Sequence, residues 1–218
     1  MQASFWIERW KKSEIGFHKS DVDINLKQFW SRLALRSGQK VFVPLCGKSL
    51  DMLWLAGQGL KVIGVELSPL ACEAFFAENN LTPRRCREGA FEVWSADEIR
   101  ILQGDVFDLG TEQLADCAGV YDRASLVALP PKMRERYVRH LTVILPAAAE
   151  ILLLTMEFDQ AQHPGPPFAV SEAEVRSLYE PVYEVKLLHT QDSFSPHSHL
   201  ARQGLTWLEE KVYRIARR

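Results

Sequence analysis

The stretch KVFVPLCGKSLDMLWLAGQG, Lys40–Gly59, decides the fold. It opens with a short apolar run, Val41–Val43, continues through Gly47, and then passes into a segment with helical character. A strand, a glycine and a helix in this order are typical of the turn that binds nucleotides in doubly wound α/β proteins. The stretch therefore raises the question of which nucleotide binds there.

Two common nucleotide motifs are absent from this stretch. The GKS of Gly47–Ser49 matches the end of a phosphate-binding loop, but Phe42 stands where that loop needs its first glycine. A dinucleotide fingerprint needs G-x-G-x-x-G, and Leu45 and Leu50 occupy the places of two of its glycines. The chain therefore lacks a glycine-rich cradle for a pyrophosphate.

Acidic residues follow the next two predicted strands. Glu66 comes directly after Val62–Val65, and Asp105 follows Ile99–Leu102. A carboxylate at the end of such a strand can accept both hydroxyls of a ribose, and each charged hydrogen bond contributes about 1.5 to 3 kcal/mol. Asp105 is placed to read an adenine amino group. An acid after a strand is also common as a helix cap, but the ordered combination with Gly47 favours a nucleoside without phosphates, S-adenosylmethionine.

Strand signals recur along the whole chain. The predicted strands are Val41–Val43, Val62–Val65, Ile99–Leu102, Gly119–Tyr121, Ile151–Thr155, Val182–His189 and Leu205–Ile215. Helical patterns lie between the early strands, so we expect a mostly parallel sheet with helices on both faces. The short connection between the last two strands favours an antiparallel pair.

Helix signals separate these strands. Ser68, as a side-chain cap before a proline, predicts a helix that runs to about Asn79. Ser171 and Glu174 form a capping box, and another helix is predicted after Pro131. Before the first strand, two further helices are expected. The second of them carries apolar residues at helical spacing behind a capping aspartate, in the order Asp23, Leu26, Phe29, Trp30 and Leu33.

Composition places the chain among ordinary globular proteins. It has 218 residues, 47% of them hydrophobic, and a formal net charge of -2, which gives no broad basic field for nucleic acid. No segment approaches the roughly 20 apolar residues of a membrane helix, and no signal peptide is recognisable. The four cysteines lack CxxC spacing and are expected to be free thiols. We therefore expect a cytoplasmic protein that binds neither nucleic acid nor membranes.

Several separate blocks resemble the thiopurine S-methyltransferase family, in its bacterial type, over nearly the whole chain. They are FWIERWKKSEIGFH (Phe5–His18), VFVPLCGKSLDMLWLA (Val41–Ala56), VIGVELS (Val62–Ser68), FDLG after Asp105, YDRASLVAL (Tyr121–Leu129), HPGPPF (His163–Phe168) and the closing EEKVYRI. The resemblance implies the class I methyltransferase fold, a doubly wound α/β fold with a seven-stranded, mostly parallel sheet. The length of the chain predicts one domain over residues 1–218. The two N-terminal helices, in residues 1–37, are expected to close over the site as a lid, and the protein is expected to be a monomer.

The resemblance implies a set of cofactor-binding residues as well. Trp10 and the backbone of Leu45 match positions that hold the methionine end, and Glu66 matches the position that holds the ribose. Asp105 and Val106 match positions that flank the adenine, and the aspartate is expected to bond the adenine amino group. The full expected set for S-adenosylmethionine is Trp6, Trp10, Leu45, Gly47, Glu66, Asp105, Val106 and Arg123.

Two tryptophans of this set have a second explanation. Trp6 and Trp10 lie four residues apart and so share one face of a helix, where an indole attracts a cationic sulfonium by about 0.5 to 2 kcal/mol. Spacing alone favours plain core or lid aromatics. The GFH that follows at Gly16–His18 favours a lid over the site.

The acceptor side rests on four residues. The resemblance places Arg123 near both cofactor and substrate, and we expect it to favour the thiolate of the acceptor as the catalytic residue; the residues alone favour a surface pair with Asp122. Phe17, Pro166 and Pro167 are expected to wall a flat aromatic pocket, although HPGPPF can equally form a stiff surface turn.

Two other candidate sites are rejected. His197 and His199 form an H-x-H pair without a third ligand, so no metal site is expected. Cys46 lies in the binding turn, but methyl transfer to sulfur needs no protein nucleophile, so a packing role is expected.

The expected function is S-methylation of aromatic or heterocyclic thiols such as thiopurines, by direct attack of a thiolate on the sulfonium methyl. Within the enzyme class, the alternative is methylation of selenium, tellurium or small sulfur compounds in detoxification. Outside it, the alternative is a nucleoside-binding sensor, which the absence of an evident catalytic acid or base allows.

Overall fold

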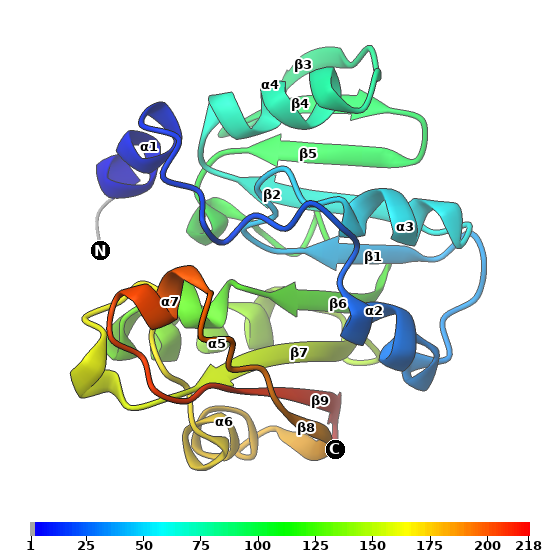
Figure 1. Cartoon of the computed structure of the whole chain (residues 1–218). Coiled ribbons are helices and arrows are strands. Elements are labelled where there is room, and N and C mark those ends of the chain that lie inside the picture. The colour runs from blue at the N-terminus through cyan, green and yellow to red at the C-terminus, as the bar shows by residue number, and fades with distance from the viewer. Residues whose placement is uncertain (1–2) are drawn as a thin grey trace.

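A computed structural model describes residues 3–218 of the chain, which form one continuous sheet flanked by helices (Figure 1). The sheet has nine strands within the described residues. They are β1 (Lys40–Val43), β2 (Lys61–Glu66), β3 (Arg84–Glu88), β4 (Phe91–Ala96), β5 (Ile99–Gln103), β6 (Cys117–Arg123), β7 (Glu150–Glu157), β8 (Tyr183–Asp192) and β9 (Glu209–Arg217). The longer helices are α1 (Ala3–Lys11), α2 (Ile24–Phe29), α3 (Asp51–Gly57), α4 (Pro69–Glu78), α5 (Pro131–Ile144), α6 (Glu172–Tyr179) and the short α7 (His199–Arg202).

The strand order is β3-β4-β5-β2-β1-β6-β7-β9-β8. The five central strands β5, β2, β1, β6 and β7 pair in parallel, while β3, β4, β8 and β9 pair antiparallel with their neighbours. The chain moves outward from β1 to one side and returns to the other side at β6. Such a switch point, at the carboxyl ends of β1 and β6, is where doubly wound sheets bind ligands.

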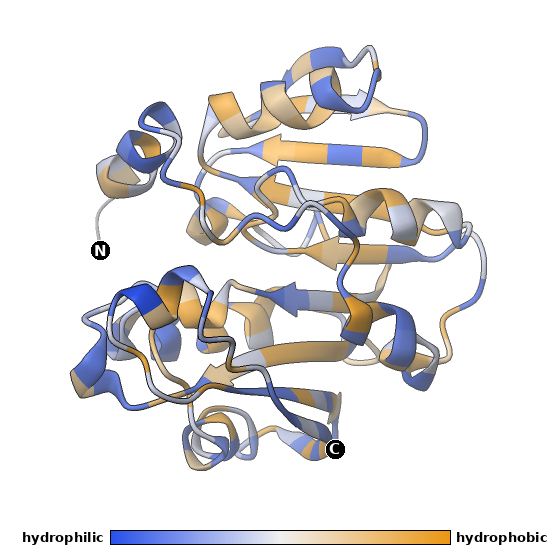
Figure 2. Cartoon of the chain, viewed as in Figure 1, coloured by the Kyte–Doolittle hydropathy of each residue, from blue (hydrophilic) through white to orange (hydrophobic). Residues whose placement is uncertain are grey.

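Helices cover both faces of the sheet. On one face α2, α3 and α4 pack through a cluster that includes Leu26, Met52 and Phe75, and on the other α5 and α6 pack through Tyr137 and Val175. Figure 2 shows hydrophobic residues along β5 and β7, within the layered core, and hydrophilic residues along β8 at the edge. The doubly wound α/β architecture predicted from the sequence is confirmed.

The sheet has nine strands where seven were expected, because one hairpin was not predicted. All seven predicted strands are present, but β3 and β4 add an antiparallel pair at the edge next to β5. Strand β3 reads RRCRE and is exposed along its whole length, so it lacks the alternation of apolar and polar residues that signals a strand. A charged, exposed edge strand also resists pairing with other chains.

The last predicted strand begins later than expected. The sequence indicated Leu205 as its start, whereas β9 begins at Glu209, and the connection from β8 contains α7. The antiparallel pairing of β8 and β9 is confirmed.

The capping predictions had mixed outcomes. Asp23 caps α2 by accepting a hydrogen bond from Asn25 N, as expected. Ser171 Oγ accepts from Glu174 N at 3.2 Å, but the Glu174 carboxylate pairs with Arg134, so only half of the capping box forms. No amide of α4 donates to the Ser68 side chain; its buried hydroxyl has no partner among the described residues.

The N-terminal segment stands apart from the sheet. Helix α1 lies beyond the carboxyl ends of the central strands, on the side where α7 also lies (Figure 1).

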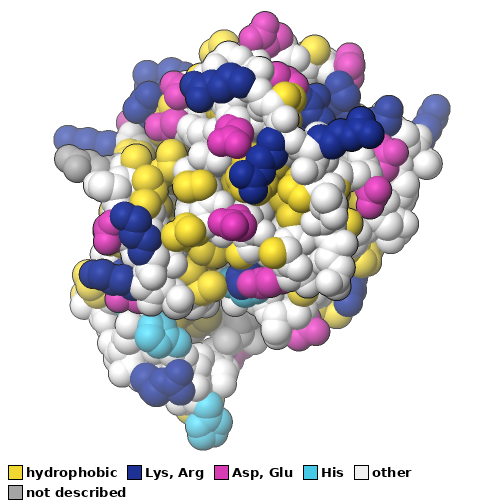
Figure 3. All heavy atoms as spheres, turned by 90° about the horizontal axis from the view of Figure 1, so that it is seen from above, with side chains coloured by type: hydrophobic (Ala, Val, Ile, Leu, Met, Phe, Trp, Pro, Cys, Tyr) yellow, Lys and Arg dark blue, Asp and Glu magenta, His cyan; other side chains and the backbone are white. Residues whose placement is uncertain are grey.

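Within the described residues, no helix combines the length and apolar character needed to cross a membrane. Figure 3 shows basic and acidic side chains interspersed over the face it views, without a broad region of one sign.

Candidate functional site

A cavity of about 1230 Å³ lies at the carboxyl ends of the central strands. Its wall contains all of the site residues predicted from the sequence, namely Trp6, Trp10, Phe17, Leu45, Gly47, Glu66, Asp105, Val106, Arg123, Pro166 and Pro167. These residues come from segments spread over most of the chain. They meet because parallel strands end at the same edge of the sheet and α1 covers that edge.

The turn after β1 forms the floor of the cavity. Leu45 and Gly47 both adopt positive φ, +46° and +53°, and Cys46 N donates to Val65 O on the neighbouring strand. Positive φ is unusual for a leucine, and such conformations concentrate at functional sites. A Cβ at Gly47 would lie 3.3 Å from the indole of Trp10, so the glycine lets this tryptophan pack against the turn.

Glu66 is buried at the end of β2, with 7% of its surface exposed. One carboxylate oxygen accepts from Gly47 N at 2.9 Å and the other from Ser68 N at 2.7 Å. Burial raises the pKa of this carboxyl to about 6, although the bonds from Ser68 and Gly47 act in the opposite direction. The carboxylate is thus held rigidly, and each oxygen keeps accepting capacity for a further donor.

Asp105 follows β5 and stays exposed to solvent. Its Oδ1 accepts from Phe107 N at 3.0 Å and so caps the single turn η2 (Val106–Asp108). Val106 is buried beside it, and the Arg136 guanidinium lies 3.8 Å from the Phe107 ring centroid. The cap uses Oδ1, and Oδ2 accepts no hydrogen bond from the described residues. Oδ2 can therefore accept one from an amino group.

Arg123 ends β6 and points into the cavity. Its Nε donates to Asp51 Oδ2 at 2.9 Å, and its Nη2 lies 3.5 Å from Ser49 Oγ. The neighbouring Asp122 faces the other way and accepts from Tyr137 at 2.7 Å. The surface pair with Asp122 that the residues alone favoured is therefore wrong, because consecutive residues of a strand point to opposite faces.

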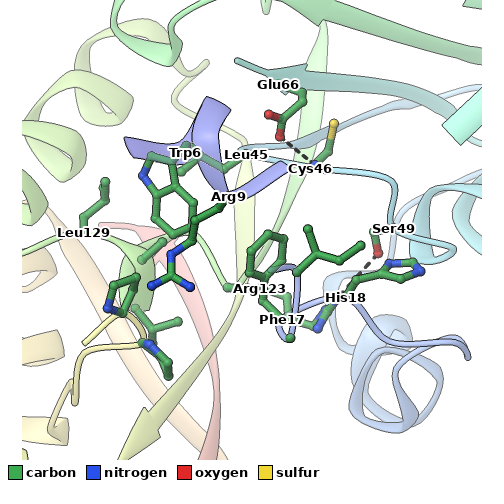
Figure 4. A pocket seen from close by; sticks show the side chains of 18 of the residues that line it. Trp6, Arg9, Phe17, His18, Leu45, Cys46, Ser49, Glu66, Arg123 and Leu129 are labelled. Carbon is green, nitrogen blue, oxygen red and sulfur yellow. Dashed lines mark hydrogen bonds between the residues drawn. The ribbon is translucent and has the colours of Figure 1, made fainter. Parts of the chain in front are cut away.

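Three aromatic rings of the N-terminal segment line the cavity together. Phe17 makes edge contacts with Trp6 and with Trp10, each with 5.8 Å between ring centroids. Figure 4 shows Trp6 and Phe17 projecting into the same space as Arg123 and Leu45. Farther along the segment, a Cβ at Gly16 would lie 3.8 Å from the ring of His199 on α7, so this segment passes close to α7.

The HPGPPF loop forms the opposite wall. The ring of Phe168 lies 2.5 Å from where a Cβ of Gly165 would be, and Gly165 has φ +79°, so only glycine fits there. Phe168 N donates to Val127 O at 2.7 Å, and a His163 ring nitrogen lies 3.2 Å from Pro166 O. The loop is thus anchored, with Pro166 and Pro167 at the cavity.

Some cavity residues were missed from the sequence. Asp51 was read only as part of a helix, although an acid one turn past the glycine was available as a signal. His18 was read only as part of the GFH motif; burial, and then the charge of Lys48, lowers its pKa. Arg9 was not predicted as a cavity residue, because the pattern that was interpreted was the tryptophan pair on either side of it.

The side chain of Cys46 is buried and packs against Gly64. Its Sγ lies 2.6 Å from where a Cβ of Gly64 would be, and burial raises the pKa of the thiol well above its usual value. A thiol that stays protonated is a poor nucleophile. All four cysteines are free.

Relatives with curated names match the chain end to end. A thiopurine S-methyltransferase from Nitrosospira multiformis is 48% identical over 218 residues, which cover 100% of this chain and 99% of the relative. One from Pseudomonas fluorescens is 47% identical over 100% of both chains.

Solved structures share the fold at lower identity. A methyltransferase dependent on S-adenosylmethionine from Anabaena variabilis aligns with a TM-score of 0.67 at 17% identity, over 99% of this chain and 95% of that chain. A 1,6-didemethyltoxoflavin-N1-methyltransferase from Burkholderia thailandensis, with bound S-adenosylhomocysteine, aligns with a TM-score of 0.62 at 16% identity, over 98% and 87%. The family model of thiopurine S-methyltransferase matches residues 1–218, and the chain belongs to this family.

Proposed function

We propose that the protein transfers the methyl group of S-adenosylmethionine to the sulfur of an aromatic or heterocyclic thiol. One observation carries the proposal. A buried carboxylate suited to a ribose, Glu66, and a cation suited to a thiolate, Arg123, lie around the same turn at Gly47 and line the same cavity. The size of that cavity exceeds the roughly 300 to 1000 Å³ of a usual single-ligand site, which leaves space for a donor beside an acceptor.

The residues present fit S-adenosylmethionine. Glu66 offers a fixed carboxylate with free accepting capacity to a ribose, and Asp105 and Val106 stand where an adenine would follow. Trp10 presents its indole over Gly47, where a cationic sulfonium would be attracted. When bound, S-adenosylmethionine supplies an electrophilic methyl group.

The acceptor side is flat and mostly apolar. Phe17 and the two prolines of HPGPPF line the same cavity as the Arg123 guanidinium. Arg123 stabilises the thiolate form of the acceptor, and the walls hold its sulfur in line with the methyl group. Such alignment is worth up to roughly 7 to 11 kcal/mol of the barrier.

The remaining parts of the proposal concern the whole molecule. We infer one domain over residues 1–218, a lid formed by residues 1–37, and a monomer in the cytoplasm. The covering position of α1 and the closeness of Gly16 to His199 of α7 support the lid.

The first test is ligand-dependent thermal unfolding with S-adenosylhomocysteine, NAD and ATP in parallel. A ligand at 100 times its dissociation constant stabilises the native state by about 2.7 kcal/mol, so S-adenosylhomocysteine alone is expected to raise Tm. A shift with NAD or ATP alone would contradict the cofactor.

The second test follows methyl transfer from labelled S-adenosylmethionine to a mercaptopyridine, selenite, tellurite and hydrogen sulfide. The heteroaromatic thiol is expected to give the highest kcat/KM. Greater turnover of the selenium or tellurium compounds would support the detoxification alternative, and binding without any product would support the sensor.

A further inference from the structure

Arg9 is a cation of the lid that faces the cavity. It lies on α1 between Trp6 and Trp10 and contributes to the cavity wall. Figure 4 shows its guanidinium extending from the lid into the open space between Leu129 and Phe17. It therefore faces the cavity near Phe17, one of the residues proposed for the acceptor wall.

The guanidinium of Arg9 has an unused donor. Its Nε is buried and has no hydrogen-bond partner among the described residues. Its Nη1 lies 3.5 Å from a carboxylate oxygen of Glu14, whose side chain is 53% exposed, and its Cζ lies 4.9 Å from the Phe5 ring centroid. An exposed pair at that distance contributes little, so the guanidinium is held near the cavity without a strong partner.

The other lid and floor cations are differently placed. Arg123 pairs with Asp51, Lys48 with Glu78, and Lys19 with Asp23. Arg136 stacks on Phe107 beside the place expected for an adenine. Among the described residues, Arg9 is thus the cavity-lining arginine with a buried donor that has no hydrogen-bond partner.

We propose that Arg9 forms an anion-binding subsite for a carboxylate carried on the ring of the acceptor thiol. An arginine presents a planar fork of donors that matches a carboxylate with two parallel hydrogen bonds. The protein then prefers mercapto carboxylic acids of aromatic or heterocyclic rings. In the reaction the acceptor sulfur forms the bond to the methyl carbon, the bond from that carbon to the sulfonium breaks, the thiol proton leaves to solvent, and the carboxylate is unchanged.

The proposal rests on the proposed function, and its test compares two acceptors of the same shape. They are a mercaptopyridine carboxylic acid, with the carboxyl across the ring from the sulfur, and the corresponding carboxamide, at a pH where both thiols are ionised. Wild-type protein is expected to show at least about tenfold higher kcat/KM for the acid, mainly through KM, because hydrogen bonds to charged groups are stronger than neutral ones.

Substitution assigns the preference to the residue. Arg9→Met is expected to reduce the acid-to-amide ratio of kcat/KM about tenfold, and Arg9→Lys to restore part of it. Lys11→Met is the matched control, because Lys11 lies on the same helix, pairs with Glu8 and is absent from the cavity wall. That variant loses the same charge and is expected to keep the wild-type ratio.

Three results would overturn the proposal. The first is equal kcat/KM of the wild type for the acid and the amide. The second is an equal fall of the acid-to-amide ratio of kcat/KM in Arg9→Met and Lys11→Met. The third is a rise in the KM of Arg9→Met for S-adenosylmethionine that is the same with either acceptor. The last would mean that Arg9 holds the carboxylate of the donor.

A binding measurement keeps the subsite testable if turnover fails. The S-methylated acid and S-methylated amide are titrated calorimetrically into protein saturated with S-adenosylhomocysteine. At least about tenfold tighter binding of the acid, lost in Arg9→Met, supports the subsite even where no methyl transfer occurs; equal binding refutes it. Absence of methyl transfer to either acceptor would instead count against the proposed function.

Discussion

Asp51 holds Arg123 in place from below the cavity. The Arg123 Nε lies 2.9 Å from Asp51 Oδ2, and the two side chains are 13% and 2% exposed. The other oxygen of Asp51 accepts from Asp23 N at 2.8 Å, where the N-terminal segment joins α2. One buried carboxylate therefore fixes both the cation at the end of β6 and the base of the lid segment.

Asp51→Asn is expected to destabilise the protein and impair catalysis together. Removing one partner of a buried ion pair leaves an uncompensated charge and costs about 3 to 5 kcal/mol. The free energy of unfolding, from urea denaturation, is expected to fall by about 3 kcal/mol, because asparagine keeps some hydrogen bonding. kcat is expected to fall more than the affinity for S-adenosylhomocysteine, since Arg123 loses its orientation.

A surface pair provides the control for this variant. Asp116 pairs with Lys40 at the same distance, 2.9 Å, but its side chain is 78% exposed. Asp116→Asn is expected to change stability by less than about 1 kcal/mol. If both variants unfold at the same urea concentration, the buried pair does not have the importance given to it here.

Glu66 gives the protein an unusual dependence of stability on pH. Its pKa is about 6 in the fold against an ordinary value of 4.5, so the native state binds more protons than the unfolded state between these values. The stabilisation is complete below pH 4.5 and is lost as pH rises through about 6, which amounts to about 2 kcal/mol. Glu66→Gln is expected to lack this component.

The measurement is the free energy of unfolding of the protein without ligand at a series of pH values. Asp122 also has a pKa raised to about 6 by burial, but it is present in both proteins. The difference between wild type and Glu66→Gln therefore isolates Glu66. Parallel curves across this pH range would show that the carboxyl is not perturbed.

Cofactor affinity is expected to show the opposite trend. Ribose hydroxyls donate to the ionised form of Glu66, so binding of S-adenosylhomocysteine strengthens as pH rises through about 6. Calorimetric titrations of wild type should show this change, and Glu66→Gln should bind weakly at every pH. A pH-independent affinity of the wild type would exclude the ribose contact.

The parts of the site predicted from the sequence are those set by strand ends. Gly47 and Asp105 follow β1 and β5, and Glu66 ends β2; parallel strands bring such residues to one edge regardless of their separation in the chain. The partner of Arg123 was not predictable in this way. Asp51 is 72 residues away in sequence, and only the fold brings the first residue of α3 to the last residue of β6.

Local rules failed where a tertiary contact competed with them. Ser68 has the sequence context of a cap and α4 begins directly after it, but its buried hydroxyl has no partner among the described residues, while its own N–H donates to Glu66. Strand β3 has no apolar face, and only its pairing with β4 makes it a strand. Both outcomes depend on neighbours that a single sequence window does not contain.

The lid can be tested by proteolysis. Lys11 and Lys12 are exposed at the end of α1, whose residues Trp6 and Trp10 face the cavity. Bound S-adenosylhomocysteine is expected to slow tryptic cleavage after these lysines, because it adds contacts to the underside of the helix. Cleavage after Arg87, on the exposed edge strand β3 and outside both the lid segment and the cavity wall, serves as the internal reference and should be unaffected.

Alanine substitutions at two glycines distinguish the effect of backbone strain from the effect of displacing a residue of the cofactor site. Gly47 and Gly89 have similar positive φ values, +53° and +58°, but a Cβ at Gly47 would lie 3.3 Å from Trp10, whereas one at Gly89 would meet open space. Alanine at either position is expected to cost about 1 kcal/mol of stability through the left-handed conformation. Only Gly47→Ala is expected to displace Trp10 and weaken binding of S-adenosylhomocysteine, by about tenfold in calorimetric titration. Equal affinities of the two variants would mean that the indole does not contribute to the cofactor site.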